Sequence, residues 1–484
     1  MTEQYMKFSE QQKNAAENLG LKAIGMLKDP DTYRCVPNKR LCIGMECLDR
    51  ELWDLMPAIP EMKKLGIGRA RLQSGWAKTE KERGVYDFEW LDKEVDALLE
   101  AGIEPWLSLS YGNPVYDTTH QSQREFGLGH VPMNSPEEKE GWLAYTRATV
   151  QHFHGRISIY EIWNEPDVIA FFPYGDRWKE IYQEMVVITS QAIREADPEA
   201  VVVGCIGNAA KFLGMLPQGI GQYLDVLSFH NYRAWPEVFG TQTRNLVRTM
   251  RDQYAPHLKL WRGEAGCPSY NPPTSRGALY DMKTSEIVQA KWLLRHLLLD
   301  LGDPMIELTS YFHAFEFEHY SHQHHYYYGI LRYPDYSRKP GYEALQLLTH
   351  IVDEGTVPVQ DISCMPAAVP EGKRSNQVLN GSCVQSFRRK GAPLCFYWYP
   401  EVLQDDSEYD LCEITHAFLP DQWQNAVLID PFTRIVYEAD LKHMPITDYP
   451  LILAEPEAVA DLVDPQTPLV YKKEETVDHQ KFEE

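Results

Sequence analysis

Short apolar runs alternate with amphipathic stretches along most of this chain. From about residue 40 the runs are apolar on both faces, as in strands of a parallel sheet covered by helices. Eight runs predict strands, at residues 41–48, 69–76, 104–112, 157–166, 200–207, 225–232, 258–266 and 305–315. The stretches between and after them repeat apolar residues with a helical period, at residues 52–65, 88–101, 136–153, 178–196, 212–223, 243–254, 285–301 and 341–352. Eight such units in roughly 310 residues predict an α/β fold, a closed (β/α)8 TIM barrel.

The segments on either side of this barrel, which is expected at residues 39–352, have different patterns. Residues 9–28 have the pattern of an amphipathic helix, so residues 1–38 are expected to form a helical extension packed on the barrel. After residue 353 the helical period disappears, and short β-rich segments alternate with Pro, Gly and Asp turns. Residues 353–484 therefore predict an antiparallel β-sandwich domain with a frayed acidic tail.

Composition narrows the class of protein. The 484 residues are 44% hydrophobic and 24% charged, and they contain no apolar run of the kind a membrane-spanning helix needs. The N-terminus lacks the apolar segment of a signal peptide. The nine cysteines are an odd number without a CxxC spacing, which is typical of thiols in a reducing compartment. We therefore expect a cytoplasmic protein.

The net charge and the aromatic content indicate which kinds of partner the protein binds. A formal charge of −23 repels phosphate backbones and anionic lipids, so neither nucleic acid nor a membrane is an expected partner. The chain has 12 Trp and 28 Tyr residues. Flat amphipathic rings suit the faces of sugars, although they suit protein cores equally well.

Two predicted strands end in glutamate. The fourth reads ISIYEIWNEP and ends with Asn164 and Glu165, and the seventh reads LKLWRGEAG and carries Glu264. Catalytic groups of parallel barrels project from the carboxyl ends of the strands, and strands four and seven face each other across the barrel mouth. Two carboxylates there could flank a glycosidic bond at about 5–5.5 Å, the separation for a retaining mechanism.

A cation is expected beside one of these carboxylates, because one must stay ionised while the other is protonated. Arg71, at the end of the second strand, is expected to hold Glu264 ionised. Arg262 is the rival, since it alternates with Glu264 along the same strand and both side chains would point inward.

The segment 158–167, SIYEIWNEPD, resembles the acid/base signature of glycoside hydrolase family 39, within clan A. It departs from the family pattern at Ser158, where the family has Trp, and at Tyr160, where it has Phe. The resemblance covers roughly residues 40–450. It implies a retaining exo-glycosidase that needs no cofactor or metal, with β-xylosidase the best-known activity. Members often form oligomers, so a homo-oligomer is expected, although the sequence identifies no interface.

The resemblance also implies roles for individual residues. Glu165 would be the general acid/base, Glu264 the nucleophile, and Asn164 a ligand of the 2-hydroxyl of the sugar. The sixth strand carries His230 and Tyr232, which would border the sugar, with Tyr232 hydrogen-bonded to Glu264. A neutral core histidine is the alternative for His230.

Further substrate-binding candidates follow the other strands. Tyr111, Asn113 and Asp117 come after the third strand, although GNP in this stretch equally fits an ordinary turn. Trp76 is expected either to stack on a sugar or to lie in the core. Glu46 is expected either to bind a hydroxyl or to form a structural ion pair.

The segment 313–328 follows the eighth strand and contains five of the sixteen histidines. We expect His313 to face the substrate and the segment to overhang the site as an aromatic lid. A metal site is the alternative, since imidazole and carboxylate are metal ligands. The sequence also leaves open another clan A enzyme (a β-galactosidase, β-glucosidase or endo-glycanase), a metal-dependent barrel hydrolase and a non-catalytic carbohydrate-binding protein.

Overall fold

The structure is a computed structural model of the 484-residue chain. It describes residues 3–116, 130–239, 241–271, 279, 282–321, 324–362, 383–406, 409–412, 423–467 and 469.

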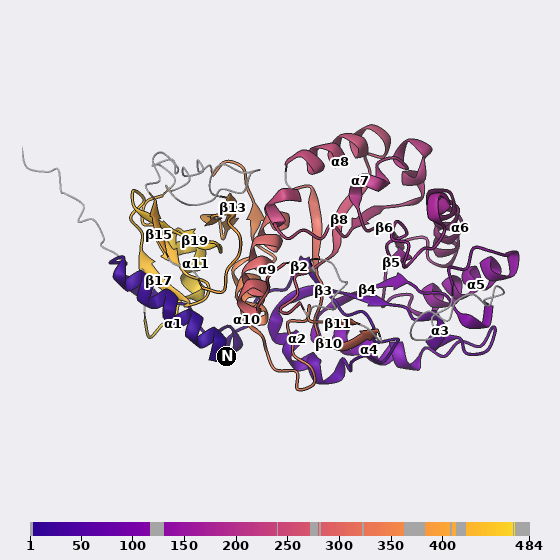
Figure 1. The fold of residues 1–484 in the computed structure, drawn as a ribbon, viewed down its shortest axis with the longest axis horizontal. Helices are drawn as coiled ribbons and strands as arrows, with labels where there is room; N and C mark the ends of the chain where they lie inside the picture. Colours follow the sequence, from indigo (N-terminus) through magenta and orange to yellow (C-terminus); the bar gives the residue numbers. More distant parts are fainter. Residues whose placement is uncertain are drawn as a thin grey trace, which may run out of the picture.

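Eight parallel strands close into a barrel, in the order of the sequence, which confirms the predicted TIM barrel (Figure 1). Each neighbour pair is parallel, and β2 pairs with β9 to close the ring. The strands are β2 (Asn38–Gly44), β3 (Ile67–Gln73), β4 (Glu104–Leu109), β5 (Ile159–Ile162), β6 (Val201–Ile206), β7 (Val226–Phe229), β8 (Lys259–Ala265) and β9 (Ile306–Tyr311).

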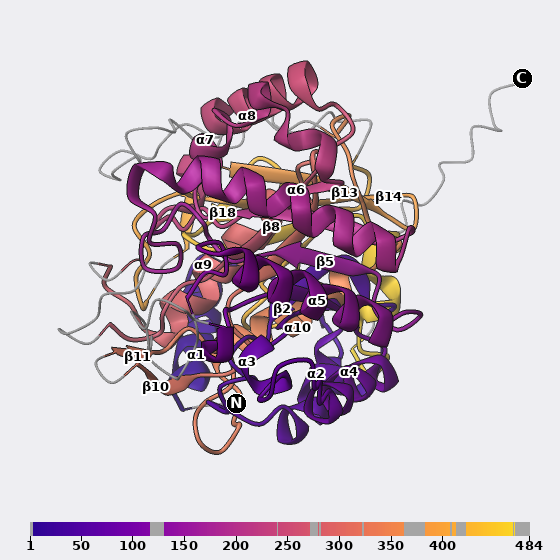
Figure 2. The same ribbon diagram turned by 90° about the vertical axis from the view of Figure 1, so that its right-hand side faces the viewer.

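Helices surround these strands, as the end-on view in Figure 2 shows for α4, α5, α6 and α8. The helices of the barrel are α2 (Ile59–Leu65), α3 (Trp76–Thr79), α4 (Glu89–Ala101), α5 (Pro136–His152), α6 (Trp178–Ala196), α7 (Ala209–Phe212), α8 (Thr241–Tyr254), α9 (Glu286–Leu301) and α10 (Pro340–Ile351). The helix expected at 212–223 is instead a short α7 followed by two 3-10 turns. Pro217 and Gly219, which has φ +84°, interrupt a regular helix there.

Apolar side chains fill the barrel interior below the carboxyl ends of the strands. Seven buried residues from seven strands form this separate cluster: Cys42, Trp106, Ile159, Val203, Val226, Trp261 and Leu308. The interior is therefore a packed core, and the open end of the barrel is the part available for chemistry.

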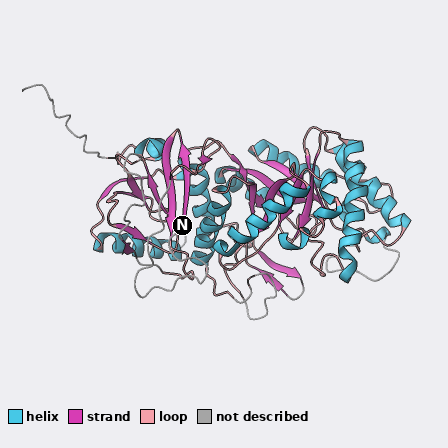
Figure 3. Cartoon of the chain, turned by 90° about the horizontal axis from the view of Figure 1, so that it is seen from above, coloured by secondary structure: helices cyan, strands magenta, loops and turns pink. Residues whose placement is uncertain are grey.

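A separate antiparallel sheet follows the barrel, as predicted, and Figure 3 shows this strand-rich part at one end of the molecule. Its seven strands run in the order β1-β17-β16-β19-β14-β13-β12, and β15 pairs with β18. The strands are β12 (Val357–Pro358), β13 (Cys383–Arg389), β14 (Ala392–Trp398), β15 (Asp410–Cys412), β16 (Val427–Ile429), β17 (Ile435–Glu438), β18 (Met444–Ile446) and β19 (Leu451–Ala454). A short helix, α11 (Pro456–Val459), follows β19, and a hairpin of β10 (Phe317–Ser321) and β11 (His324–Tyr326) follows the last barrel strand.

The N-terminal segment lies along this C-terminal domain (Figure 1). Helix α1 (Glu3–Asn18) packs the ring of Phe8 against Phe432 and Tyr449, and the Lys291 ammonium of α9 lies 5.0 Å from the centre of the same ring. The helix expected to reach residue 28 ends at Asn18, ten residues earlier. Gly20, just beyond this end, has φ +76°. Strand β1 (Ala23–Met26) follows and extends the C-terminal sheet by pairing with β17.

Helix α9 connects the two domains, because its charged side chains are buried between them. Arg295 binds Glu237 of the β7–α8 loop at 2.6 Å and the carbonyl of Glu401 at 2.9 Å. Lys291 lies 3.0 Å from Asp448. In the described parts of the chain, no helix combines the length and the hydropathy needed to cross a membrane.

Candidate active site

A strained turn places Glu165 at the barrel mouth. Strand β5 ends at Ile162, and both Trp163 (φ 65°) and Glu165 (φ 45°) then take left-handed backbone conformations. Non-glycine residues rarely adopt this region, and such strain concentrates at functional sites. The carboxylate of Asp167 holds the turn by accepting hydrogen bonds from the backbone amides of residues 207 and 208, at 2.6 and 3.1 Å.

Glu264 lies near the end of β8 and both of its carboxylate oxygens are engaged. The Tyr232 hydroxyl donates a hydrogen bond of 2.7 Å to Oε1, and Arg71 donates one of 2.8 Å to Oε2. The side chains of Glu165 and Glu264 are each 13% exposed, so both are accessible at the mouth while being mostly enclosed.

The two glutamates are close together. One carboxylate oxygen from each, and a ring nitrogen of His230, all lie within 4.8 Å of one another. The two carboxyl groups are thus close enough for both to act on one reacting bond.

Arg71 is the central cation of the site and is fully buried. Besides Glu264, it donates to Glu161 at 2.6 and 2.9 Å, to Glu46 at 2.8 Å and to the Asn164 side-chain oxygen at 3.0 Å. Burial alone would lower the pKa of Arg71, but the three carboxylates raise it well above its usual value. The guanidinium therefore stays charged and fixes the orientation of all four side chains.

The pKa values of Glu264 and Glu46, the two carboxyl groups bound to Nη1 of Arg71, shift in opposite directions. Burial raises the pKa of Glu264, while His230 and Arg71 oppose this rise. Burial would also raise the pKa of Glu46, but the hydrogen bond from His313 and the charge of Arg71 lower it to about 2. The cationic neighbours thus outweigh burial at Glu46, whereas at Glu264 burial outweighs them.

His230 connects Glu165 to a buried thiol. Its Nδ1 lies 3.0 Å from Glu165 Oε1, and its Nε2 lies 3.4 Å from the Sγ of Cys205 on β6. Burial would lower the pKa of His230, but Cys205, Glu264 and Glu165 raise it well above the ordinary value. Burial raises the pKa of the Cys205 thiol to about 11. The imidazole is therefore held between the thiol and the carboxylate of Glu165.

The structure brings five of the candidate residues together around the two glutamates. Arg71, Asn164, His230 and Tyr232 surround the two glutamates, and the Tyr111 hydroxyl accepts a hydrogen bond of 2.9 Å from the Asn164 amide. Arg71 contacts Glu264 as expected, while its role in keeping that carboxyl ionised stays a prediction, because burial raises the pKa of Glu264.

Three other candidates, Trp76, Asn113 and His313, do not reach the two glutamates. Trp76 is fully buried among Tyr116, Trp142 and Tyr145, so its indole has no open face for a sugar. The Asn113 amide donates to the backbone carbonyl of residue 80 at 2.7 Å and serves its own loop. His313 is fully buried, and its Nε2 lies 3.2 Å from Glu46, so it supports that carboxylate from behind.

Arg262 does not compete with Arg71. Its guanidinium binds Asp300 of α9 at 2.7 Å, on the outside of the barrel, so the inward direction expected for it is wrong. The pairing of β8 with β9 is irregular between Arg262 and Ala265. Such an irregularity breaks the alternation of side chains, and Arg262 and Glu264 therefore face opposite sides.

Some candidates lie outside the described residues. Asp117 belongs to this group, as does His322. Of the side chains of His319, His324 and His325, the structure describes nothing, so the expected lid and its metal alternative are untested.

Two residues of the site are not predicted from the sequence. Glu161 is fully buried and binds Arg71, and Cys205 contacts His230. Glu161 had a signal, because an acid inside the apolar run IYEI requires a buried partner. Cys205 had none, since a cysteine in an apolar strand is an ordinary core residue.

The chain is similar to known glycoside hydrolases. Residues 72–365 match the family model described as Glycosyl hydrolases family 39. A β-xylosidase from Geobacillus stearothermophilus is 27% identical over 126 residues, which are 25% of this chain and 24% of that protein. The match thus spans only about a quarter of the relative's length.

Solved structures extend the similarity over most of the chain. A family 39 glycoside hydrolase from Bacteroides cellulosilyticus WH2 has a TM-score of 0.62 at 17% identity, over 88% of this chain and 82% of that chain. A GH39 β-xylosidase from Caulobacter crescentus has a TM-score of 0.56 at 18% identity, over 90% and 97%. At these identities the structures show a common fold.

Proposed function

Because this chain belongs to glycosyl hydrolases family 39, we propose that it hydrolyses β-linked glycosides with retention of the anomeric configuration. One observation carries the proposal. Carboxylate oxygens of Glu165 and Glu264 lie within 4.8 Å of each other. Retaining enzymes hold the two carboxyl groups about 5–5.5 Å apart, whereas inverting enzymes need about 6.5–9.5 Å to admit a water molecule.

In the first step Glu264 is the nucleophile and Glu165 is the general acid. An oxygen of Glu264 forms a bond to the anomeric carbon as the glycosidic bond breaks, and the proton of Glu165 passes to the leaving oxygen. The ionised form of Glu264 is supported by the hydrogen bonds from Arg71 and Tyr232. The positive charge that develops at the anomeric carbon is met by the Glu264 carboxylate, which these two bonds already hold in place.

In the second step Glu165 changes from acid to base. It takes a proton from a water molecule whose oxygen attacks the anomeric carbon, and the bond to Glu264 breaks. His230, 3.0 Å from Glu165, keeps this carboxyl group oriented for both steps. The amide of Asn164, fixed between Arg71 and Tyr111, is suited to contact the 2-hydroxyl of the sugar.

The sugar is proposed by similarity. The Geobacillus relative and the Caulobacter structure are both named as β-xylosidases, so β-xylosides are the first substrates to test, with exo action. The seven described free thiols support a reducing compartment, and we propose a cytoplasmic location.

A metal-dependent mechanism is disfavoured because the candidate ligand atoms already have partners. Glu165, His230 and Glu264 have atoms close enough to bind one ion, but both oxygens of Glu264 already accept hydrogen bonds, from Arg71 at 2.8 Å and from Tyr232 at 2.7 Å.

The test is hydrolysis of a panel of aryl β-glycosides by the wild type, Glu165→Ala and Glu264→Ala, with and without azide. Both variants are expected to lose activity. Azide should restore turnover and give a β-glycosyl azide from Glu165→Ala and an α-glycosyl azide from Glu264→Ala. Full activity of Glu264→Ala would rule out Glu264 as the nucleophile. Loss of wild-type activity on treatment with a chelator would favour the metal-dependent alternative.

A further inference from the structure

The loop between β7 and α8, at residues 230–239, carries a buried carboxylate that the proposed reaction does not use. Tyr232 in this loop donates the 2.7 Å hydrogen bond to Oε1 of Glu264. Five residues further along, the side chain of Glu237 is buried, with 3% of the residue exposed. A buried carboxylate needs partners, because removing its charge from water is costly. The partners of Glu237 therefore indicate what holds this loop in place.

Glu237 has its partners in two other parts of the fold. Arg295 of α9 donates to both of its carboxylate oxygens, at 2.6 and 2.7 Å, and such bidentate pairs have a well-defined geometry. Trp398, the last residue of β14, donates its indole N–H to Oε1 at 2.8 Å. Arg295 and Trp398 are both fully buried. Glu237 thus connects the loop after β7 to the C-terminal domain through bonds that are shielded from water.

Helix α9 also fixes the backbone on either side of Tyr232. The indole N–H of Trp292 donates to the carbonyl of Arg233 at 2.9 Å. Arg262, which is itself paired with α9, donates to the carbonyl of Asn231 at 3.1 Å. The carbonyls before and after Tyr232 therefore both have donors whose positions depend on α9.

The guanidinium of Arg295 binds the loop and the C-terminal domain at the same time. Besides Glu237, it donates to the backbone carbonyls of Glu401 and Asp448, at 2.9 and 3.3 Å. Burial would lower the pKa of Arg295, but the carboxylate of Glu237 raises it. The guanidinium therefore stays charged, and a shift of the C-terminal domain would displace a group that binds the loop.

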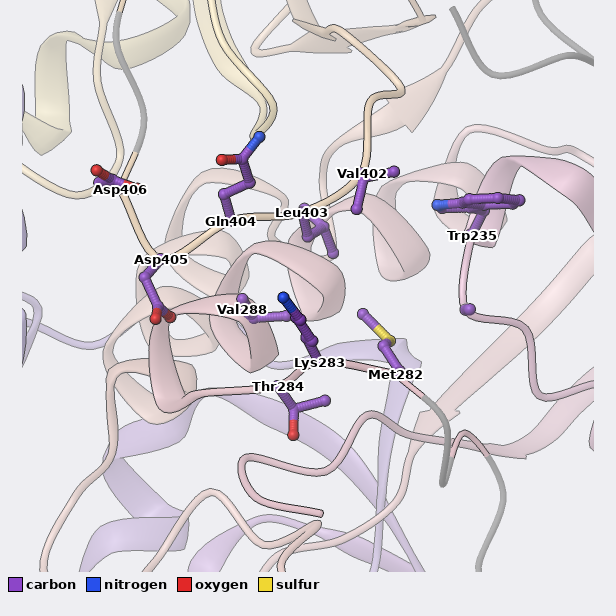
Figure 4. Close-up of a pocket in the computed structure, with 11 residues that line it drawn as sticks. Trp235, Met282, Lys283, Thr284, Val288, Val402, Leu403, Gln404, Asp405 and Asp406 are labelled. Atoms are coloured by element: carbon purple, nitrogen blue, oxygen red, sulfur yellow. The ribbon is translucent and has the colours of Figure 1, made fainter. Parts of the chain in front are cut away.

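Packing alone does not hold this loop against the C-terminal domain. A cavity of about 720 Å³ lies between them, as Figure 4 shows, and is lined by Ala234, Trp235, residues 282–284, Val288 and residues 402–406. Trp235 is 41% exposed beside this cavity. Because the cavity takes the place of side-chain contacts, dispersion contributes little there. The hydrogen bonds of the buried carboxylate are therefore the main attachment of the loop to this domain.

We propose that Glu237 is a positioning residue of the active site, through which the C-terminal domain orients Tyr232. Trp398 and Arg295 hold the carboxylate of Glu237. The loop then places the hydroxyl of Tyr232 against Glu264. The proposal rests on the function proposed above, in which that carboxylate is the nucleophile. It gives the C-terminal domain a part in catalysis, although the residues around the two reacting carboxyl groups all belong to the barrel.

The first experiment is a double-mutant cycle, measured as kcat/KM for an aryl β-glycoside that the wild type cleaves. Trp398→Phe removes the N–H that binds Glu237 and keeps an aromatic ring. It is expected to lower kcat/KM about three- to tenfold, the effect of one hydrogen bond. In a Tyr232→Phe background the same substitution should have no further effect, because the hydroxyl that it positions is already absent. Equal losses in the two backgrounds would overturn the proposal.

Tyr397→Phe is the matched control for damage to the C-terminal domain. Tyr397 is the neighbouring residue on β14, and its hydroxyl donates to the carbonyl of Pro445 at 2.9 Å, within that domain. This variant also loses a buried hydrogen bond, but the bond does not reach the loop after β7. Its kcat/KM should equal that of the wild type, and a loss as large as that of Trp398→Phe would overturn the proposal.

Glu237→Gln tests the buried carboxylate itself. It keeps the size of the side chain and removes the charge that binds Arg295, so kcat/KM should fall at least as far as in Trp398→Phe. The acid limb of the profile should also move to higher pH, because a displaced hydroxyl no longer favours the ionised nucleophile. The other charged neighbours of Glu264 are unaltered in this variant: Arg71, His230, Glu165 and Glu46. An unchanged kcat/KM and an unchanged limb would contradict the proposal.

A measurement without substrate separates failure of this proposal from failure of the proposed hydrolysis. Hydrogen–deuterium exchange of residues 226–237 should be about three- to tenfold faster in Trp398→Phe than in the wild type, and unchanged in Tyr397→Phe. Unchanged exchange in Trp398→Phe would overturn the proposal even if glycosides are cleaved. If the wild type cleaves no glycoside while exchange of this segment increases, the proposed hydrolysis fails and the attachment of the loop to the C-terminal domain stands.

Discussion

Nη1 of Arg71 donates a hydrogen bond of 2.8 Å to Oε2 of Glu264, across the mouth of the barrel from β3 to β8. The same guanidinium also holds Glu161 and Glu46, so one cation pairs with three carboxylates in a mostly enclosed space. Charges in such a place depend on one another, because each would be costly to bury alone. The orientation of Glu264 is thus a property of the whole group.

Arg71→Met is expected to lower the free energy of unfolding by about 3–5 kcal/mol, because it leaves buried carboxylates without their cation. It should also abolish glycosidase activity, since Glu264 loses the group that holds it. Urea denaturation at neutral pH measures the first effect.

The double variant Arg71→Met/Glu161→Gln separates charge from packing. Glu161 has two hydrogen bonds to Arg71, and neutralising it removes one of the uncompensated charges. Part of the lost stability should therefore return, while activity stays absent. A double variant no more stable than Arg71→Met would mean that packing, and not charge, dominates the loss.

Tyr232→Phe is expected to reduce kcat/KM about ten- to a hundredfold, because hydrogen bonds to charged groups contribute roughly 1.5–3 kcal/mol. The Tyr232 hydroxyl favours the ionised form of Glu264, so its removal raises the pKa of that carboxyl further in the direction that burial already gives. The acid limb of the kcat/KM profile should therefore move to higher pH. Tyr174→Phe is the control. It loses a hydroxyl that donates to Asn134 at 3.0 Å and does not contact the glutamates, so the acid limb should stay in place.

Much of this site could be predicted because its residues stand at strand ends. The apolar runs that stop at Glu165 and reach Glu264 define both the barrel and the face on which the carboxylates meet. Arg71 followed from the same reasoning, since a buried carboxylate pair needs a cation.

What the sequence could not predict depends on local geometry. The irregular pairing near Arg262 turns that side chain outward, and no residue type marks such an irregularity in the sequence. Trp76 follows a strand as a stacking residue would, yet neighbouring rings enclose it completely. The contact between Cys205 and His230 joins two strands through side chains, and periodicity contains no information on such a pair.

Cys205→Val is expected to lower kcat about three- to tenfold, the effect of losing one hydrogen bond that positions His230. His230 would then orient Glu165 less well, and the pH profile of kcat should change together with its magnitude. Cys205→Ser keeps a hydrogen-bonding group and should recover most of the activity. Cys42→Val is the matched control, because this buried thiol contacts Trp106 in the packed core of the barrel. Equal losses in both valine variants would point to packing alone.

Asp430 predicts a pH dependence of stability that is separate from catalysis. Burial raises its pKa to about 6, although the backbone amide of Phe432 and the Tyr449 hydroxyl donate hydrogen bonds to it at 2.8 and 3.0 Å. The unfolded chain has a value of about 3.9, so between about pH 4 and 6 the folded state binds the extra proton. Stability due to this group is therefore present at low pH and is lost as the pH rises through 6.

Asp430→Asn removes this proton binding, so the variant should gain about 3 kcal/mol relative to the wild type between pH 4 and pH 7. Denaturation at a series of pH values gives this difference directly. Asp461→Asn should show the opposite trend: partial burial would raise the pKa of Asp461, but Arg389 and Lys390 lower it to about 2. Its carboxylate stabilises the fold above the pKa of the unfolded chain, so that variant should be less stable than the wild type at pH 7 and approach it as the pH falls. Parallel profiles for the two variants would contradict the assignment of Asp430 as the proton-binding group.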